Sequence, residues 1–186
     1  MELFRVFHWD GTSQGGEGGG PLFVPRIHQG AGRHDAPDRY AAWYATRQAV
    51  GAIAERIQHL RGQALTNADC RRMGRVSLAI VGLRLDTSLA VVDLDHPRQL
   101  IKRHLRPSRV ATRRRRETQA IARRIFDEGA AGMSWWSTLD ADWTNVTLFY
   151  ERVVKHVAIS TPPRKLTIEM PEVAEAADHL GVQISR

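Results

Sequence analysis

Three residues at regular spacing carry side chains suited to chemistry: Arg33, Tyr44 and Glu55, each 11 positions from the next. An arginine can donate two N–H hydrogen bonds to the oxygens of a phosphate, and an aromatic ring can stack on a cationic ring. A carboxylate can stabilise positive charge that develops during a reaction. Together these side chains suit a ligand that contains both a diphosphate and an aromatic cation.

The segment that carries them, residues 32–56, predicts a turn, a short strand and a helix. Alternation over residues 40–45 places Tyr40, Ala42 and Tyr44 on one strand face and the residues between them on the other. We expect Thr46 to cap the helix that follows. The apolar stripe of this helix comprises Val50, Ile53, Ala54, Ile57 and Leu60. An arginine before the strand, an aromatic near its end and a carboxylate on the helix can then converge on one cleft.

This segment resembles the RES domain family in the order of its residues. The matching positions are Gly32-Arg33-His34-Asp35, Pro37, Trp43-Tyr44-Ala45 and Glu55, with the N-terminal Phe4-Arg5-Val6 and the later Gly132 and Ser137. The resemblance covers roughly residues 3–150. Two positions depart from the family pattern. His34 stands where a large aromatic is usual, and Thr138 stands where arginine often follows the serine.

The resemblance implies an α+β fold similar to ADP-ribosyltransferases, with a curved, split, mixed β-sheet and flanking helices. It implies an enzyme that breaks the nicotinamide–ribose bond of NAD, with NAD as substrate and no cofactor. The ribosyl acceptor is left open among water, phosphate and a protein side chain, so glycohydrolase, phosphorylase and ADP-ribosyltransferase all fit. Many family members are toxins of toxin–antitoxin pairs, so an Xre-type antitoxin is the expected partner.

Within this resemblance each candidate residue has an expected role. Glu55 is expected to stabilise charge on the ribose or to accept hydrogen bonds from its hydroxyls, and Tyr44 to stack on nicotinamide. Arg33 is expected to bind the diphosphate or the ribose side. Ser137 can hydrogen-bond the carboxamide or ribose, and Arg5 is a second phosphate contact or an ion-pair partner.

Each of these residues, taken alone, also has an ordinary structural explanation. Arg33 can be a surface turn residue, Tyr44 a core aromatic, Glu55 a solvated helix carboxylate and Ser137 a strand-end hydroxyl. Their joint order favours the enzyme. The alternative is a catalytically weak RES-like binding module that uses a basic surface for a protein or nucleic-acid partner. The eight histidines show no metal-ligand spacing, so no metal site is expected.

Composition agrees with one globular domain. The 186 residues suffice for a single sizeable core, so we expect one RES domain over 1–186, with 151–186 as its C-terminal strands and helix. No apolar run approaches the ~20 residues of a membrane span, and the N-terminus does not match a signal peptide. The single Cys70 excludes an internal disulfide, which fits a cytoplasmic protein.

The net charge of +7 owes much to the run Arg113–Arg116 before a helix. A solvated surface, a nucleic-acid contact and an acidic protein partner all explain such a run. No aromatic interleaving or nucleic-acid-binding signature accompanies it, so direct nucleic-acid binding is not expected.

Elsewhere the sequence predicts an α+β succession. Strands are expected at residues 3–9, 76–85, 89–94, 131–137, 153–159 and 165–170, with the second and third joined by a short turn. Helices are expected from Pro97, over 117–128 with a stop at Gly129, and from Pro171 to the region of Gly181. The glycine-rich residues 11–20 are expected to form a mobile surface loop, or a lid over the ligand.

Overall fold

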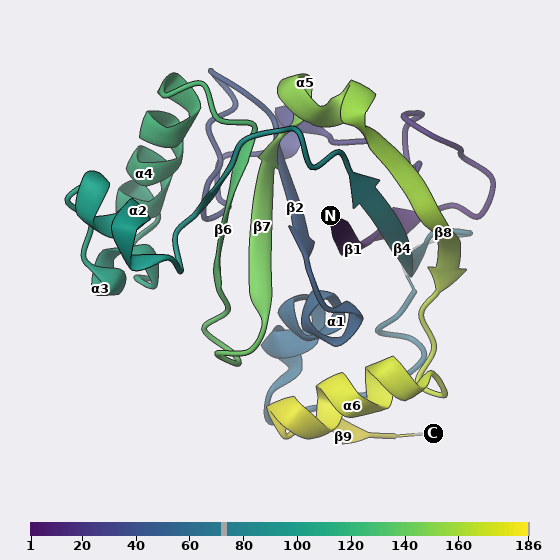
Figure 1. Ribbon diagram of the computed structural model, residues 1–186. Coiled ribbons are helices and arrows are strands. Elements are labelled where there is room, and N and C mark those ends of the chain that lie inside the picture. The colour runs from purple at the N-terminus through teal and green to yellow at the C-terminus, as the bar shows by residue number, and fades with distance from the viewer. Residues whose placement is uncertain (72–73, 186) are drawn as a thin grey trace. The chain divides into compact units, whose positions relative to one another are not determined.

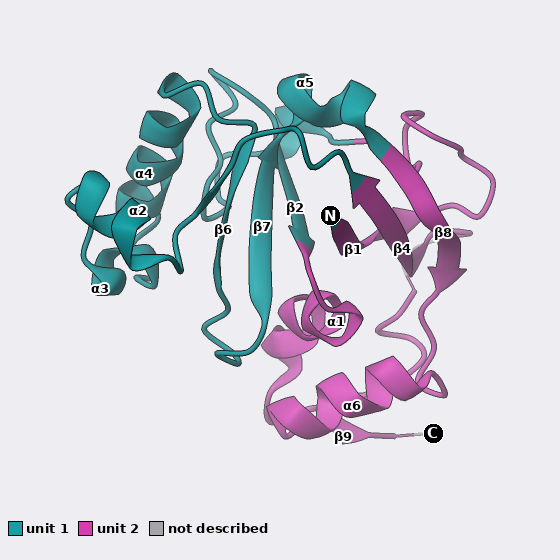
Figure 2. Cartoon of the chain, in the orientation of Figure 1, with its two compact units in different colours: residues 1, 24–45, 85–157 teal, residues 2–23, 46–84, 158–186 magenta. Residues whose placement is uncertain are grey.

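The computed structural model describes residues 1–71 and 74–185, and these divide into two compact units (Figure 2). Unit 1 contains Met1, Val24–Ala45 and Leu85–Val157. Unit 2 contains Glu2–Phe23, Thr46–Arg84 and the chain from Ala158 onward. Each unit is therefore assembled from segments that lie far apart in the sequence.

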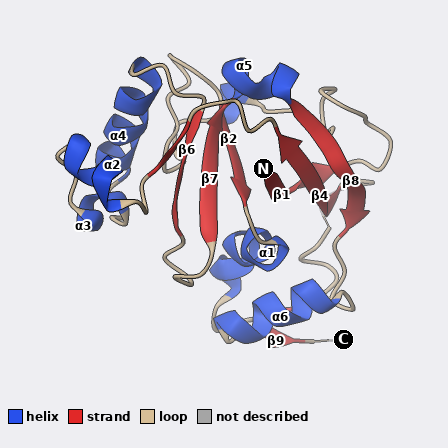
Figure 3. Cartoon of the chain, in the orientation of Figure 1, coloured by secondary structure: helices blue, strands red, loops and turns tan. Residues whose placement is uncertain are grey.

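The strands form a seven-stranded sheet with the hydrogen-bonded order β5-β6-β7-β2-β1-β4-β8 (Figure 1). Their bounds are β1 Glu2–Trp9, β2 Ala42–Thr46, β4 Ser77–Leu85, β5 Val91–Asp93, β6 Gly132–Trp136, β7 Thr144–Phe149 and β8 Val157–Lys165. The β5–β6 pair is parallel, whereas β1 pairs antiparallel with β2 and β4, and β6 with β7. A short parallel pair, β3 Ala64–Leu65 with β9 Gln183–Ile184, forms separately. With the helices, this sheet confirms the α+β class and the mixed sheet (Figure 3).

Unit 1 is organised around one hydrophobic cluster beneath its helices. The helical elements are η1 Arg26–His28, α2 Pro97–Lys102, α3 Pro107–Val110, α4 Arg115–Asp127, α5 Tyr150–Val153 and η3 Val154–His156. Leu100 of α2, Val110 of α3 and Ile125 of α4 enter the same cluster as Tyr40 and Phe149. Ala42 and Tyr44 also belong to or pack against it, which confirms the strand face expected from alternation.

Unit 2 places the helix that carries Glu55 between β1 and the C-terminal helix. Helix α1 is Ala49–Ile57, followed by η2 Gln58–Leu60, and α6 is Pro171–Leu180. Helix α1 contacts both β1 and α6, and its buried residues include Ile53, Ala54 and Ile57 from the expected stripe. The C-terminal helix ends where expected, because Gly181 adopts a left-handed conformation (φ +67°) that closes it.

Two expectations about helix starts are wrong. Thr46 is the last residue of β2, and its hydroxyl donates to the carbonyl of Gln48, which is the residue that precedes α1. Helix α4 begins at Arg115 rather than at residue 117, so half of the arginine run is helical. A capping propensity alone did not decide where α1 begins, and the start of α4 differs from the expectation by two residues.

One strand expectation needs correction. Strand β8 runs over Val157–Lys165 through Pro162 and Pro163, so it includes only residues 157–159 and 165 of the strands expected at 153–159 and 165–170. Residues 153–156 are helical, in α5 and η3, and residues 166–170 lie outside any helix or strand. Proline is tolerated in β8 because this strand stands at the end of the strand order, where one side needs no ladder hydrogen bonds. Strands β4 and β5 confirm the two expected strands joined by a short turn, and in the sheet order they are not neighbours. Strand β7, which pairs with β6, was not expected at all.

Backbone hydrogen bonds and Asp10 organise the glycine-rich segment. Asp10 accepts from the backbone N–H groups of Thr12 and Ser13 at 2.8 and 2.7 Å. Leu22 donates to the carbonyl of Gly15 at 2.9 Å. Among the described residues, no helix has the length and apolar character needed to cross a membrane.

Candidate active site

The turn that carries Arg33 is built around the buried carboxylate of Asp35. One oxygen, Oδ2, accepts hydrogen bonds from the backbone N–H groups of Gly30 and Gly32 at 2.8 and 2.7 Å. The other, Oδ1, accepts from the Tyr44 hydroxyl at 2.6 Å. Both oxygens of a 5% exposed carboxylate therefore have donors, as a buried charge requires. Asp35 thus joins the turn to β2.

The position of the Asp35 carboxylate requires glycine at position 32. A Cβ atom built at Gly32 would lie 2.5 Å from Oδ1 of Asp35 and 2.7 Å from its Cγ. Side-chain carbon cannot approach that closely, so the carboxylate would have to leave its donors. The Gly-Arg dipeptide is therefore explained by packing, with glycine making room for the carboxylate that fixes the arginine turn.

Tyr44 is held at its hydroxyl from two sides. It donates to Asp35 and accepts the backbone N–H of His34 at 2.8 Å. Burial, and then the neighbouring Asp35 carboxylate, raise the pKa of Tyr44 far above its ordinary value. The phenol stays protonated near neutral pH, so Tyr44 is not a base. Its ring packs against the core cluster of unit 1 and is held in place by these contacts.

His34, which replaces the usual aromatic of the family, occupies an aromatic position in the core. Its ring is 2% exposed and meets Trp135 of β6 edge-on, with ring centres 4.4 Å apart. Its Nδ1 lies 2.9 Å from the hydroxyl of Thr147 on β7. Burial lowers the pKa of His34 well below its ordinary value, and the positive charges of Arg33 and Arg115 lower it further. His34 is therefore neutral at physiological pH.

Arg33 binds the segment that joins α3 to α4. Its Nη1 donates to the backbone carbonyls of Thr112 at 2.7 Å and Val110 at 3.2 Å. From α4, Thr118 donates its hydroxyl to the carbonyl of Arg33. Gln119 donates to the carbonyls of Gly30 and Gly32 at 3.0 and 2.9 Å. The start of α4 and the arginine turn are thus one hydrogen-bonded assembly.

Ser137 follows β6 and organises the turn to β7. Its backbone N–H donates to the carbonyl of Trp143 at 2.7 Å, and its Oγ accepts the backbone N–H of Leu139 at 3.1 Å. Its side chain is buried, whereas the neighbouring Thr138 is exposed. Trp135, two residues before Ser137, contacts His34, so unit 1 links this strand end to the arginine turn.

The other two candidates belong to unit 2. Glu55 is half-buried on α1, and its Oε2 accepts from the side-chain amide of Gln58 at 2.8 Å. Arg5 on β1 donates from Nη1 to the carbonyl of Pro21 and from Nη2 to that of Phe23, each at 2.8 Å. Arg5 therefore holds the end of the glycine-rich segment. The roles of all five candidates toward a substrate remain predictions.

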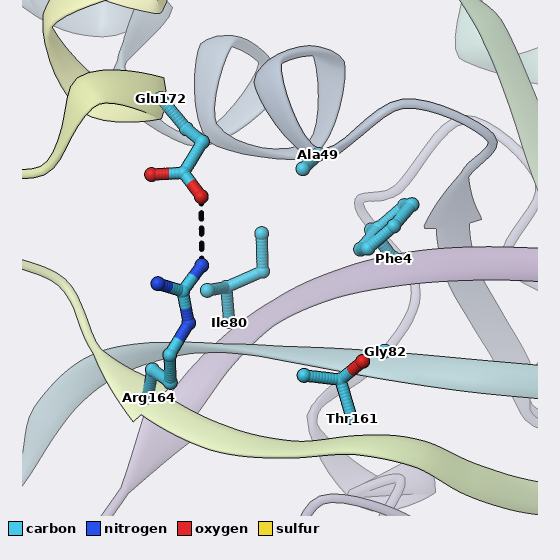
Figure 4. A pocket seen from close by; sticks show the side chains of 7 residues that line it. All are labelled: Phe4, Ala49, Ile80, Gly82, Thr161, Arg164 and Glu172. Carbon is cyan, nitrogen blue, oxygen red and sulfur yellow. Dashed lines mark hydrogen bonds and ion pairs between the residues drawn. The ribbon is translucent and has the colours of Figure 1, made fainter.

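Unit 2 also contains a pocket of about 200 Å³ (Figure 4). It is lined by Phe4, Ala49, Ile80, Gly82, Thr161, Arg164 and Glu172. An ion pair of 2.7 Å joins Arg164 to Glu172 at this pocket. None of the five candidate residues lines it, so it adds nothing to the chemistry argued from the sequence.

Several supporting residues were not identified from sequence. Asp35 belongs to the quoted motif, but its role as the carboxylate at the centre of the turn was not recognised. Thr118 had a detectable signal, because it is a hydroxyl on the apolar stripe of α4 with Ile121, Ala122 and Ile125. Within residues 1–71 and 74–185, no cluster of three or more His, Cys, Asp or Glu side chains could hold a metal ion.

Comparison with known families decides the family. The family model described as the RES domain matches residues 3–169. The chain belongs to the RES domain family. This RES domain is also similar to a solved chain of the M. tuberculosis MbcT–MbcA toxin–antitoxin complex, with 15% identity, a TM-score of 0.64 and coverage of 97% of this chain and 89% of that one. At that identity the likeness concerns the fold. A search of curated proteins finds no match.

Asp35→Asn tests the central carboxylate of this RES domain. The asparagine keeps the shape but turns an amide N–H₂ toward one of the three donors, which leaves a buried polar group unpaired. We expect a loss of about 1–3 kcal/mol in the free energy of unfolding, measured by urea titration. Asp38→Asn is the control, since Asp38 is exposed, and its effect should be much smaller. Equal losses in the two variants would refute the central role of Asp35.

His34→Phe tests the neutral histidine through pH. The unfolded chain takes up a proton on His34 near pH ~6.5, whereas burial prevents this in the folded state. The contribution of His34 to the free energy of unfolding is therefore fully present above that pH. It is lost as the pH falls below it, by up to about 1.4 kcal/mol per pH unit. Urea titrations from pH ~7 to ~5 should show a shallower decline for His34→Phe than for the parent. The exposed His28→Gln control should keep the parental slope, and an unchanged slope in His34→Phe would contradict the assignment.

Proposed function

We propose that this RES-domain protein is the toxin of a toxin–antitoxin pair and that it cleaves the nicotinamide–ribose bond of NAD. The supporting observation is that Arg33, Tyr44, Glu55 and Ser137 occur in family order within the matched residues 3–169. The fold likeness to a chain of a toxin–antitoxin complex supports the toxin assignment. NAD is the substrate in this proposal, and no cofactor takes part.

The chemistry places one demand on the protein. When the bond between ribose and nicotinamide breaks, its electron pair leaves with the nicotinamide, which becomes neutral, and positive charge develops on the ribose. A carboxylate stabilises that charge more in the transition state than in the ground state, and this difference accelerates the reaction. Glu55 would supply it. Water, phosphate or a protein side chain then forms the new bond to the ribose and gives up a proton.

The remaining candidates would bind and orient NAD. Tyr44 would stack on the nicotinamide ring, and its hydroxyl contacts to Asp35 and His34 fix the ring plane in advance. Arg33 would bind the diphosphate, and Ser137 the carboxamide or ribose. Arg5 is the least direct candidate, because both terminal nitrogens of its guanidinium donate to the backbone carbonyls of Pro21 and Phe23.

The proposed partner is an Xre-type antitoxin that silences the enzyme. The decisive experiment is incubation of the purified protein with NAD, with and without inorganic phosphate, followed by detection of nicotinamide. Release without phosphate indicates hydrolysis, and release that requires phosphate indicates phosphorolysis. Release only with a protein acceptor indicates ADP-ribosylation. No release under any of these conditions would favour the RES-like binding module instead.

Glu55→Gln tests the transition-state carboxylate. The amide keeps the size of the side chain and removes its charge, so nicotinamide release should fall ~10²-fold or more while the fold persists by circular dichroism. Glu175→Gln is the matched control, because Glu175 is an exposed carboxylate on α6 of the same unit, and it should keep parental activity. Equal activity in the Glu55 variant and the parent would exclude Glu55 from the reaction.

Arg33→Lys and Arg33→Ala test the phosphate contact. Lysine keeps the charge but loses the planar fork, so we expect NAD affinity to fall in the order parent, Lys, Ala. The affinity is measured by calorimetric titration of NAD in the Glu55→Gln background, which slows the consumption of substrate during the measurement. Arg39→Ala is the control, since Arg39 pairs with Asp127 on the surface of the same unit. If the Ala variant bound NAD as tightly as its Glu55→Gln background, Arg33 would have only the structural role of holding Val110 and Thr112.

A further inference from the structure

Positive charge is concentrated in one part of unit 1. Residues 97–124, from α2 to α4, contain eleven Lys and Arg residues and a single acidic residue, Glu117, for a net charge of +10. Since the whole chain carries +7, the other residues together carry −3. The arginine run noticed in the sequence is therefore only part of a larger basic surface, built by three consecutive helices.

Some of these cations serve the fold. Arg103 is buried and pairs with Glu128, Arg123 pairs with Asp38 at 2.7 Å, and Glu117 lies 3.4 and 3.3 Å from Arg109 and Arg114. Six others are exposed, and none has an ion pair with a residue that the structure describes: Arg98, Lys102, Arg106, Arg113, Arg115 and Arg116. These six cations, with Ile101, are called the basic face below.

The basic face also includes an exposed apolar side chain on α2. Ile101 is 74% exposed, which is unusual for a large aliphatic side chain, and it lies between Arg98 and Lys102 in the sequence. The neighbouring Leu100 is buried, so α2 is anchored through one side while Ile101 points to solvent. A patch that combines positive charge with an exposed aliphatic side chain fits a partner with carboxylates around an apolar side chain.

The surface is held in a fixed shape. Leu100, Val110 and Ile125 tie α2, α3 and α4 to the same core cluster, and Figure 1 shows these helices gathered in one part of unit 1. Arg124 of α4 donates to the carbonyl of Arg103 after α2 at 2.9 Å. Arg33 holds the carbonyls of Val110 and Thr112 between α3 and α4. A surface ordered before binding loses little entropy when a partner docks.

We propose that the basic face is a docking surface for an acidic protein segment that places an apolar side chain against Ile101. Residues 97–124 contain no Phe, Tyr or Trp on which nucleic-acid bases could stack, and Ile101 has no use in a contact with phosphates. The observations therefore favour a protein partner over nucleic acid. This inference goes beyond the NAD chemistry and does not depend on it.

The test measures binding of a fluorescein-labelled synthetic peptide that carries glutamates around leucines, by fluorescence anisotropy with the full-length protein. The triple variant Arg98→Gln/Lys102→Gln/Arg106→Gln should bind it about tenfold more weakly, as expected for three exposed charge contacts. The control variant Arg61→Gln/Arg75→Gln/Lys155→Gln removes three exposed cations outside residues 97–124 and should bind like the parent. Circular dichroism confirms that both variants are folded.

Two further comparisons separate charge from the apolar contact and protein from nucleic acid. Ile101→Ser should weaken the binding of the glutamate–leucine peptide but should not weaken the binding of polyglutamate. Binding of both should weaken from about 0.1 M to about 1 M NaCl, as the Debye length falls from ~10 Å to ~3 Å. No binding of the peptide, equal losses in the two triple variants, or no effect of Ile101→Ser would overturn the proposal. Tighter binding of a mixed-sequence DNA duplex than of the peptide would assign the face to nucleic acid and overturn it as well.

Discussion

The candidate site of unit 1 depends on the hydrogen bonds that the buried carboxylate of Asp35 accepts. Their donors are the backbone N–H groups of Gly30 and Gly32 and the hydroxyl of Tyr44. Removing a charge from water is unfavourable unless each lone pair finds a donor, so the turn and the strand can exist in this form only together. The glycine at position 32 follows from the same constraint, since any Cβ there would collide with the carboxylate.

The constraint extends outward from the turn. With Asp35 in place, the backbone carries Arg33 toward α4, where Thr118 and Gln119 donate hydrogen bonds to the carbonyls of the turn. It also carries His34 into the core, where Trp135 and Thr147 surround it. The residue that departs from the family pattern is thus accommodated as a neutral ring. The helices that support the turn also present the basic face to solvent.

The sequence named candidate residues for the chemistry but not the groups that hold them. Arg33 and Tyr44 became candidates because of their types and order, and the strand face of Tyr44 was predicted because alternation has a fixed period. The contact of Arg33 with Thr112 joins residues 79 positions apart, and no local pattern specifies it. Sequence analysis did not predict β7 and misplaced the bounds of β8, since pairing and edge position depend on neighbours brought together by folding.

By itself, the sequence determined those features that local sterics and periodicity fix. These are the glycine-arginine turn, the apolar stripes of the helices and the helix ends at Gly129 and Gly181, where a positive φ suits glycine. The tertiary structure decided the order of the strands, the continuation of β8 through two prolines, the neutrality of His34 and the exposure of Ile101. The physical reason is that burial and hydrogen bonding between distant segments set the native protonation states, the strand pairing and the exposure of side chains, and folding alone brings those segments together.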